Sequence, residues 1–530
     1  MKHWKMKGFL LLLSLMLVIA GCGGNTESGS STTEPAETPA AEADAGSDAG
    51  AAASDKVLTI ANAIDLESFD FHNNNQTVSE SILVNMFDYL LKNDDKGNQV
   101  PGLATSWEKL DDTTWRFKLR EGVTFHNGDP FTSADVKFTL ERAAKDTTLK
   151  QNTLYKQILE VKIVDEYTVD IVTDGPDPTL LNRLSRMGSG MMPSKYIEAN
   201  GMEAFLQAPI GTGPYKFVQW TKDDRVEMVA NPDYFGGAPK WDKLVFRAIP
   251  EASTRVAELL TGGVDIAAGV PSTDVERIDA SGDAKVVKAP IKRVLQILLR
   301  HTEGTPTADP KVREAIDLAI DKQAIVDSIA GGAGVLTRTS VTPGNFGTEP
   351  SLYGQALYDP ERAKQLLQEA GYTSAGPVVS FSAQSQYKEY AEVVAAMLTA
   401  VGFTVNLEVL EASAFSEKMS SKSFGEIFML GIGNSMNDAS NNYTRYLFER
   451  AKGESDYNNP EVEELLQAAA VNMDPASRLA QFQQVQNIFA EDRPAVYLFQ
   501  MEGMYGVGAG VEFAPRSDEM FFAEEINPVE

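Results

Sequence analysis

The stretch EGVTFHNGDPFTSADVKFTLER, residues 121–142, contains the signals of a strand, a turn and a helix in direct succession. Residues 123–125 are a short apolar run, and residues 127–130 (NGDP) are of the types that favour tight turns. Residues 132–135 then resemble a helix start, because hydroxyl and carboxylate side chains there satisfy the first free amides. This stretch predicts a structural role, not a binding one.

Hydrophobic periodicity predicts strands and helices in alternation on both sides of this stretch. Strands are expected at residues 57–61, 114–119, 168–173, 377–382 and 404–410. Helices are expected at residues 77–91, 310–327, 359–370, 390–401, 460–471 and 475–490. Thr77 followed by Glu80 predicts a capping box at the first helix. The β-α-β order in the second half is typical of an α/β domain.

The composition excludes several classes of protein. The formal net charge of -28 repels phosphate backbones, so nucleic-acid binding is not expected. A hydrophobic content of 43% is that of a soluble globular protein.

The N-terminal residues have the plan of an export signal. Three lysines precede the apolar residues 9–20, which predicts a signal peptide at residues 1–21. Residues 19–22 (IAGC) resemble the lipobox of bacterial lipoproteins, which implies that Cys22 becomes the lipidated N-terminus. The alternative is a secreted protein with a free thiol. Residues 22–55 contain too little apolar surface to fold and are predicted to be a disordered tether.

The stretch at 121–142 and the preceding VPGLATSWEKLDDTTWRFKLR resemble the signature of a known family. This is the peptide/nickel family, family 5, of extracytoplasmic solute-binding proteins, the receptors of ABC importers. Further stretches follow in the family's order, at residues 209–217, 231–239, 258–267, 309–326 and 363–372, with YNNPEVEELLQAA and IFAEDRPAVYLF near the end. The resemblance spans nearly all of the chain from Lys56.

The resemblance implies an α/β fold of the two-lobed, type II periplasmic-binding-protein class, which closes like a Venus flytrap. Lobe one is expected at residues 56–90, 208–300 and 496–530, with an inserted domain at 91–207. Lobe two is expected at residues 301–495. Two chain crossings then form a hinge, and a ligand that contacts both lobes only in the closed state shifts the population toward that state.

The function implied is the capture of oligopeptides and their delivery to an ABC permease. The receptor is expected to be a monomer without cofactors, held by lipid on the outer face of the cytoplasmic membrane. An oligosaccharide, opine or nickel chelate remains an alternative ligand. A receptor for a peptide pheromone is a further alternative, because its sequence would have the same features.

The sequence gives little indication of a catalytic site. The folded part contains no GxSxG elbow, and His72, His126 and His301 are scattered singly, so neither a hydrolase triad nor a metal site is indicated. Residues 211–214 (GTGP) lack the third glycine of a phosphate loop and predict a tight turn. A surface-tethered enzyme is therefore the least supported alternative.

Ligand contacts are expected in three loops. By resemblance to peptide-binding relatives, Asp438 in the segment 431–448 pairs with a peptide ammonium, although Ile432 stands where a tryptophan is usual; the alternative is a loop cap. The neighbouring candidates are Asn437, Asn441 and Arg445.

The second loop, residues 381–390, supplies Gln384 and Tyr387 but lacks the arginine that holds the carboxylate in dipeptide binders. This absence argues against simple free dipeptides. The third loop, residues 73–76, supplies Asn74 and Asn75, whose amides both donate and accept hydrogen bonds; a surface turn is its alternative role.

Overall fold

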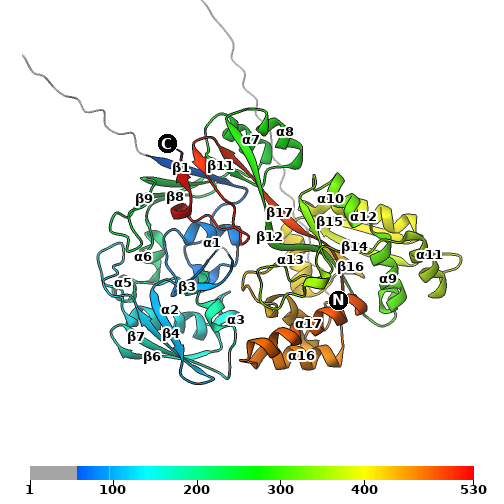
Figure 1. Ribbon diagram of the computed structural model, residues 1–530, viewed down its shortest axis with the longest axis horizontal. Helices are drawn as coiled ribbons and strands as arrows, with labels where there is room; N and C mark the ends of the chain where they lie inside the picture. Colours follow the sequence, from blue (N-terminus) through cyan, green and yellow to red (C-terminus); the bar gives the residue numbers. More distant parts are fainter. Residues whose placement is uncertain (1–55, 95, 530) are drawn as a thin grey trace, which may run out of the picture. The chain divides into compact units, whose positions relative to one another are not determined.

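A computed structural model describes residues 56–94 and 96–529 (Figure 1). The predicted signal peptide, Cys22 and the tether lie outside the described residues. Within the described part, no helix combines the length and apolarity needed to cross a bilayer.

One 11-stranded sheet runs through the described residues, in the order β15-β14-β16-β12-β17-β11-β1-β10-β9-β8, with β13 paired to β17. Its strands are β1 (Val57–Asn62), β8 (Tyr215–Thr221), β9 (Arg225–Ala230), β10 (Lys243–Ala248), β11 (Ile266–Ala268), β12 (Ala284–Leu299), β13 (Gly334–Leu336), β14 (Val378–Gln384), β15 (Thr404–Leu410), β16 (Ile427–Gly433) and β17 (Ala495–Gly508). The strands predicted at 57–61, 377–382 and 404–410 are confirmed.

The two long strands β12 and β17 join the halves of this sheet, and they lie side by side in Figure 1. They pair antiparallel from Ala284 to Leu298, but the register is interrupted between Pro290 and Val294. One end of β12 packs in a cluster with Val256 of lobe one. The other end packs in a cluster of lobe two that contains Leu295. We call the β11-to-β8 half with its attached segments lobe one, and the β15-to-β16 half lobe two.

Helices cover the lobe-two half of the sheet and form a second cluster beside it. The bounds are α9 (Pro310–Ala319), α10 (Lys322–Ser328), α11 (Pro360–Glu369), α12 (Lys388–Ala400), α13 (Ala412–Ser421), α14 (Ser440–Tyr443), α15 (Phe448–Ala451), α16 (Pro460–Val471) and α17 (Pro475–Asp492). The predicted helix 310–327 is two helices, because the backbone of Ile320 is extended and Asp321 caps α10 by accepting from the amide of Ala324. The other four helices predicted here are confirmed.

A separate four-stranded sheet, in the order β4-β5-β7-β6, lies within the predicted inserted domain. Its strands are β4 (Ala104–Lys109), β5 (Thr114–Leu119), β6 (Ile158–Asp165) and β7 (Thr168–Thr173), and β2 (Leu91–Asn93) pairs with β3 (Gln99–Pro101) nearby in the chain. Helix α2 (Ser133–Lys145) begins with the capping box of Thr132 and Asp135, as the opening stretch predicts. The predicted lobe and domain limits stay predictions.

The remaining helices belong to lobe one and its inserted part. They are α1 (Thr77–Leu83), α3 (Asn152–Tyr155), α4 (Leu180–Arg183), α5 (Ser194–Asn200), α6 (Met202–Gln207), α7 (Ala252–Leu260) and α8 (Val275–Asp279). The short strands β18 (Val511–Glu512) and β19 (Asn527–Pro528) pair near the end of the chain.

The helix predicted at 77–91 is wrong beyond residue 83. The carbonyls of Asn85 and Met86 accept hydrogen bonds from the amides of Tyr215 and Gly213, and those of Tyr89 and Leu90 accept from the 103–104 segment. These tertiary bonds replace the helical ladder. The predicted capping box is also wrong, because the cap residue is Gln76 and no side chain bonds the free amides there.

Residues 212–214 form a bend, and the amides of Gly211 and Gly213 are both bonded within the fold. The amide of Gly211 donates to Nδ1 of His126, at 3.2 Å, and that of Gly213 donates to Met86. The bend lies so close to residues 85–87 that a Cβ on Gly211 would be 1.9 Å from the Met86 carbonyl oxygen.

We expect Gly211→Ala to destabilise lobe one by about 1–3 kcal/mol, because the methyl group must displace backbone. The midpoint of urea unfolding measures this change. Gly510→Ala is the matched control, since a Cβ there meets nothing within 4 Å. Equal midpoints for the two variants would contradict the close approach.

Candidate ligand-binding cleft

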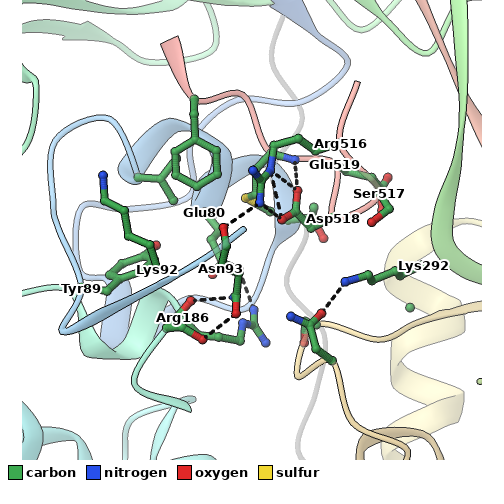
Figure 2. Close-up of a pocket in the computed structure, with 18 of the residues that line it drawn as sticks. Glu80, Tyr89, Lys92, Asn93, Arg186, Lys292, Arg516, Ser517, Asp518 and Glu519 are labelled. Carbon is green, nitrogen blue, oxygen red and sulfur yellow. Dashed lines mark hydrogen bonds and ion pairs between the residues drawn. The ribbon is translucent and has the colours of Figure 1, made fainter. Parts of the chain in front are cut away.

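A cavity of about 220 Å³ lies where the two lobes and the long strands meet (Figure 2). Lobe one lines it with residues from 75–93, 185–186 and 516–522. The interrupted part of β12 contributes Lys292 and Arg293, and the loop after β16 contributes residues 433–437. Segments of both lobes therefore line this cavity.

Most charged groups of the cavity wall are paired with one another. Arg186 and Glu80 approach to 2.5 Å, and the second oxygen of Glu80 accepts from the amide of Met187. Arg516 and Asp518 form a second pair, at 2.8 Å, and Figure 2 marks it with dashed lines. These pairs hold the wall in shape and cancel most of its charge.

Asp88 is the most buried carboxylate of the cavity wall. Its oxygens accept from the hydroxyls of Thr212, at 3.0 Å, and Tyr234, at 2.9 Å. Lys92 lies 3.5 Å away and also pairs with Glu524. Burial raises the pKa of Asp88, although Lys92 and the two hydroxyls oppose that rise.

Lys292 lies at the centre of the junction. Its amide donates to the Ser517 carbonyl of lobe one, and its carbonyl accepts from the amide of Asn434 in lobe two, each at 2.8 Å. Its ammonium donates to Oδ1 of Asn437 at 2.6 Å. Burial lowers the pKa of Lys292, because the ammonium loses hydration; Asp518 and Asp94 oppose this effect.

The lobe-two loop that reaches Lys292 is fixed by its own asparagines. Asn437 has a left-handed backbone (φ 52°), which asparagine tolerates better than most residues. The side chain of Asn434 donates to the Asp438 carbonyl at 2.9 Å and accepts from the amide of Met436. Asn182 of lobe one donates to the Met436 carbonyl at 2.7 Å, so this loop also contacts the opposite lobe.

Of the predicted site residues, Asn75 and Asn437 line the cavity. Asp438 instead lines a second cavity of about 640 Å³, which shares Asn437 with the first. Asp438 is 2% exposed, and its carboxylate accepts two hydrogen bonds from Arg478, at 2.6 and 2.8 Å. The chain therefore supplies a cation for Asp438 itself, and the predicted ammonium contact stays a prediction.

The other five predicted residues lie outside the described linings of both cavities. Asn74 is fully buried, with its carbonyl bonded to Gln151. The amide of Asn441 donates to the Asp438 carbonyl, and Arg445 is paired with Glu454. The loop predicted at 381–390 is wrong in extent, because β14 runs to Gln384 and α12 begins at Lys388. Gln384 accepts from Gln386, and Tyr387 is buried near Gly431.

Of the three histidines, His72 is fully buried, and His126 and His301 are partly buried. Burial lowers the pKa of His72 to about 3, that of His126 to about 4 and that of His301 to about 3. Among the described residues, no group of three or more histidine, cysteine or acidic side chains is placed to hold a metal.

Sequence reasoning missed Lys292, Arg293 and the charged 516–519 segment. A signal was present for the first two, since the basic pair lies between Pro290-Ile291 and the mostly apolar run 294–299. Two adjacent charges in a long buried strand predict a break or a site. The contact of residues 516–519 with this pair has no local sequence signal.

We expect Asp438→Asn to lower the free energy of unfolding by about 3–5 kcal/mol, because it leaves the buried Arg478 guanidinium without a counter-charge. Urea unfolding measures this loss in the absence of ligand. Glu369→Gln is the control, since its partnership with Arg362 is exposed and should leave the midpoint almost unchanged. An unchanged midpoint for Asp438→Asn with weaker ligand binding would instead favour the ammonium contact.

Comparison with curated proteins finds relatives over most of the chain. The glutathione-binding protein GsiB of Escherichia coli (strain K12) is 28% identical over 461 residues, covering 84% of this chain and 88% of GsiB. The same protein of Salmonella paratyphi A gives the same identity and coverage.

Among solved structures, the substrate-binding protein CtaP of Listeria monocytogenes superposes with a TM-score of 0.80 at 20% identity, covering 90% of this chain and all of CtaP. The oligopeptide-binding protein AppA of Bacillus subtilis, solved with a nonapeptide, gives a TM-score of 0.76 at 23% identity and covers 89% and 99% of the two chains. At these identities the likeness establishes the two-lobed fold. A family model, described as bacterial extracellular solute-binding proteins, family 5 middle, matches residues 98–454. The chain therefore belongs to the family 5 bacterial extracellular solute-binding proteins.

Proposed function

We propose that this protein captures short peptides or peptide-like solutes outside the cytoplasm, in the cleft between its lobes, and delivers them to the permease of an ABC importer. The observation that carries the proposal is the cavity at the lobe junction, which residues of both lobes line. A solute that contacts both walls stabilises the closed form relative to the open one. The permease then distinguishes loaded from empty receptor by shape.

The chemistry of the cavity wall supports a peptide-like ligand. Its side-chain amides come from Asn75, Asn93, Asn434 and Asn437. Amides both donate and accept, as the peptide group does, so they suit a ligand that contains amide bonds. The glutathione-binding relatives, whose named ligand is a tripeptide, point in the same direction.

The second cavity supports some tolerance of ligand length. It is about 640 Å³ and continues from Asn437 along residues 96–99 and 177–182 of lobe one. A peptide longer than the first cavity would reach this space by passing Asn437, the residue that lines both cavities. The proposed role is binding without chemistry, by a monomer.

We further propose that Cys22 is lipidated and anchors the protein to the outer face of the cytoplasmic membrane. The lipobox-like residues 19–22 and the polar tether that follows support this anchor. A single acyl chain binds a membrane weakly, whereas several chains on one cysteine give stable attachment.

We expect Cys22→Ser to release the folded protein from the membrane, because no thiol remains to be acylated. Immunoblots of membrane and soluble fractions measure the distribution, with a serine substitution in the tether, Thr26→Ser, as the control. Retention of the Cys22→Ser protein in the membrane fraction would contradict the anchor.

We expect peptides to stabilise the purified full chain against heat by about 2.7 kcal/mol at a concentration one hundred times Kd. A thermal-shift screen of reduced glutathione, peptides of two to nine residues, nickel–histidine chelate and oligosaccharides measures this effect. Bound peptide should be recovered unchanged by mass spectrometry. A shift with sugar or chelate alone would overturn the proposed ligand, and recovery of cleaved peptide would contradict a pure binding role.

A further inference from the structure

The charged side chains of the cleft cavity do not balance. Within the described residues, five basic and four acidic side chains line it. Each acid is paired with a base that also lines the cavity. The pairs are Glu80 with Arg186 (2.5 Å), Asp88 with Lys92 (3.5 Å), Glu519 with Arg293 (3.2 Å) and Asp518 with Arg516 (2.8 Å). In this part of the chain, Lys292 is the lining cation left without a carboxylate partner.

Lys292 is also poorly hydrated. Its exposed fraction is 7%, and its ammonium has one described hydrogen-bond partner, the neutral amide of Asn437. An ammonium donates up to three hydrogen bonds, so two donors remain for the cavity. A cation removed from water and left without a counter-charge is costly, which favours an anion arriving from outside.

The surroundings of Lys292 confine that anion to the cavity. On the lobe-one side, the turn at Gly97 comes so close that a Cβ there would be 3.3 Å from the ammonium nitrogen. On the lobe-two side, Asn437 covers it. The charged groups that act on it at longer range are Asp518, Arg516 and Asp94, and Asp518 is already bound by Arg516.

We infer that Lys292 binds a carboxylate of the captured solute, and that the solute is therefore a short acidic peptide or peptide-like acid. This inference rests on the proposed function and narrows it. All four carboxylates of the wall are engaged, so a solute whose charge is only positive finds no vacant partner in this cavity. A solute with a free carboxylate supplies the partner that Lys292 lacks.

A second polar group of the cavity lacks a partner. The hydroxyl of Tyr89 is buried, and it has no hydrogen-bond partner in the described structure. Figure 2 draws Tyr89 and Lys292 on opposite sides of the cavity. The apolar ring of Tyr89 thus forms part of the wall across from Lys292, and its buried hydroxyl is not counted as a contact for the solute.

The test compares peptides that have free carboxylates with analogues in which the carboxyl groups are neutral because they are capped as esters or amides; both members of each pair keep the ammonium group. The probes are reduced glutathione against its diethyl ester, and triglycine against triglycine amide, with affinities for the full chain measured by calorimetry. We expect each acid to bind about ten- to a hundredfold more tightly than its neutral analogue, the scale of a charge-assisted hydrogen bond. Lys292→Met should remove this preference, and Lys292→Arg should retain part of it.

Lys288→Met is the matched control, because Lys288 is exposed on the same strand, outside the cavity lining. It should keep the full preference for acids. The inference is overturned if Lys292→Met, folded by circular dichroism, still prefers the acids. If Lys292→Met does not fold, the test uses the natural protein and Lys292→Arg. For each protein, the affinity for the acid is divided by the affinity for its capped analogue, and a ratio near one in the natural protein overturns the inference.

The outcomes separate this inference from the proposed function. Equal binding of acid and neutral probes overturns the inference and leaves a peptide receptor intact. If none of the four probes binds, the inferred class of short acidic solutes falls, while the longer peptides of the thermal-shift screen decide the proposed function.

Discussion

The pairing of β12 with β17 is the constraint on which the rest of the molecule depends. These two strands belong to both halves of one hydrogen-bonded sheet, and their ends are buried in different hydrophobic clusters. The lobes therefore cannot separate without breaking backbone hydrogen bonds, but they can bend where the ladder is already broken, between Pro290 and Val294. The position of that break determines which residues face the cleft.

The cleft shows how a polar wall is kept stable away from bulk water. Each acid that lines it has a base within 4 Å, and Asp88 is further held by two hydroxyls. Buried pairs of this kind contribute little net stability, because desolvation offsets their attraction. Their effect here is to fix the shape of the wall and to leave a single cation unmatched among the described lining residues.

Local patterns predicted most of the regular elements. The capping box at Thr132 and the helices with apolar residues at three- and four-residue spacing depend on neighbours in the sequence, so the sequence contains their cause. The helix expected to run to residue 91 ends at Leu83, because its later carbonyls bond the 213–215 segment. No periodicity in residues 77–91 records that distant partner.

The site was predictable only in part, for the same reason. The sequence placed Asn75 and Asn437 in ligand-facing loops, and both line the cavity. It did not show that Arg478, forty residues after Asp438, would occupy that carboxylate. Nor did it show that the 516–519 segment would lie beside Lys292, since that contact joins segments more than two hundred residues apart.

The break in the ladder has a further consequence for how such a receptor can change over time. Residues 291–293 lie where the register of the two strands is interrupted, and two of them, Lys292 and Arg293, line the cavity. Under the proposed function, a substitution there would act both on the break between the strands and on the wall that meets the solute. Solute selectivity and the flexibility between the lobes would then depend on the same residues. A change in selectivity during evolution would also change that flexibility.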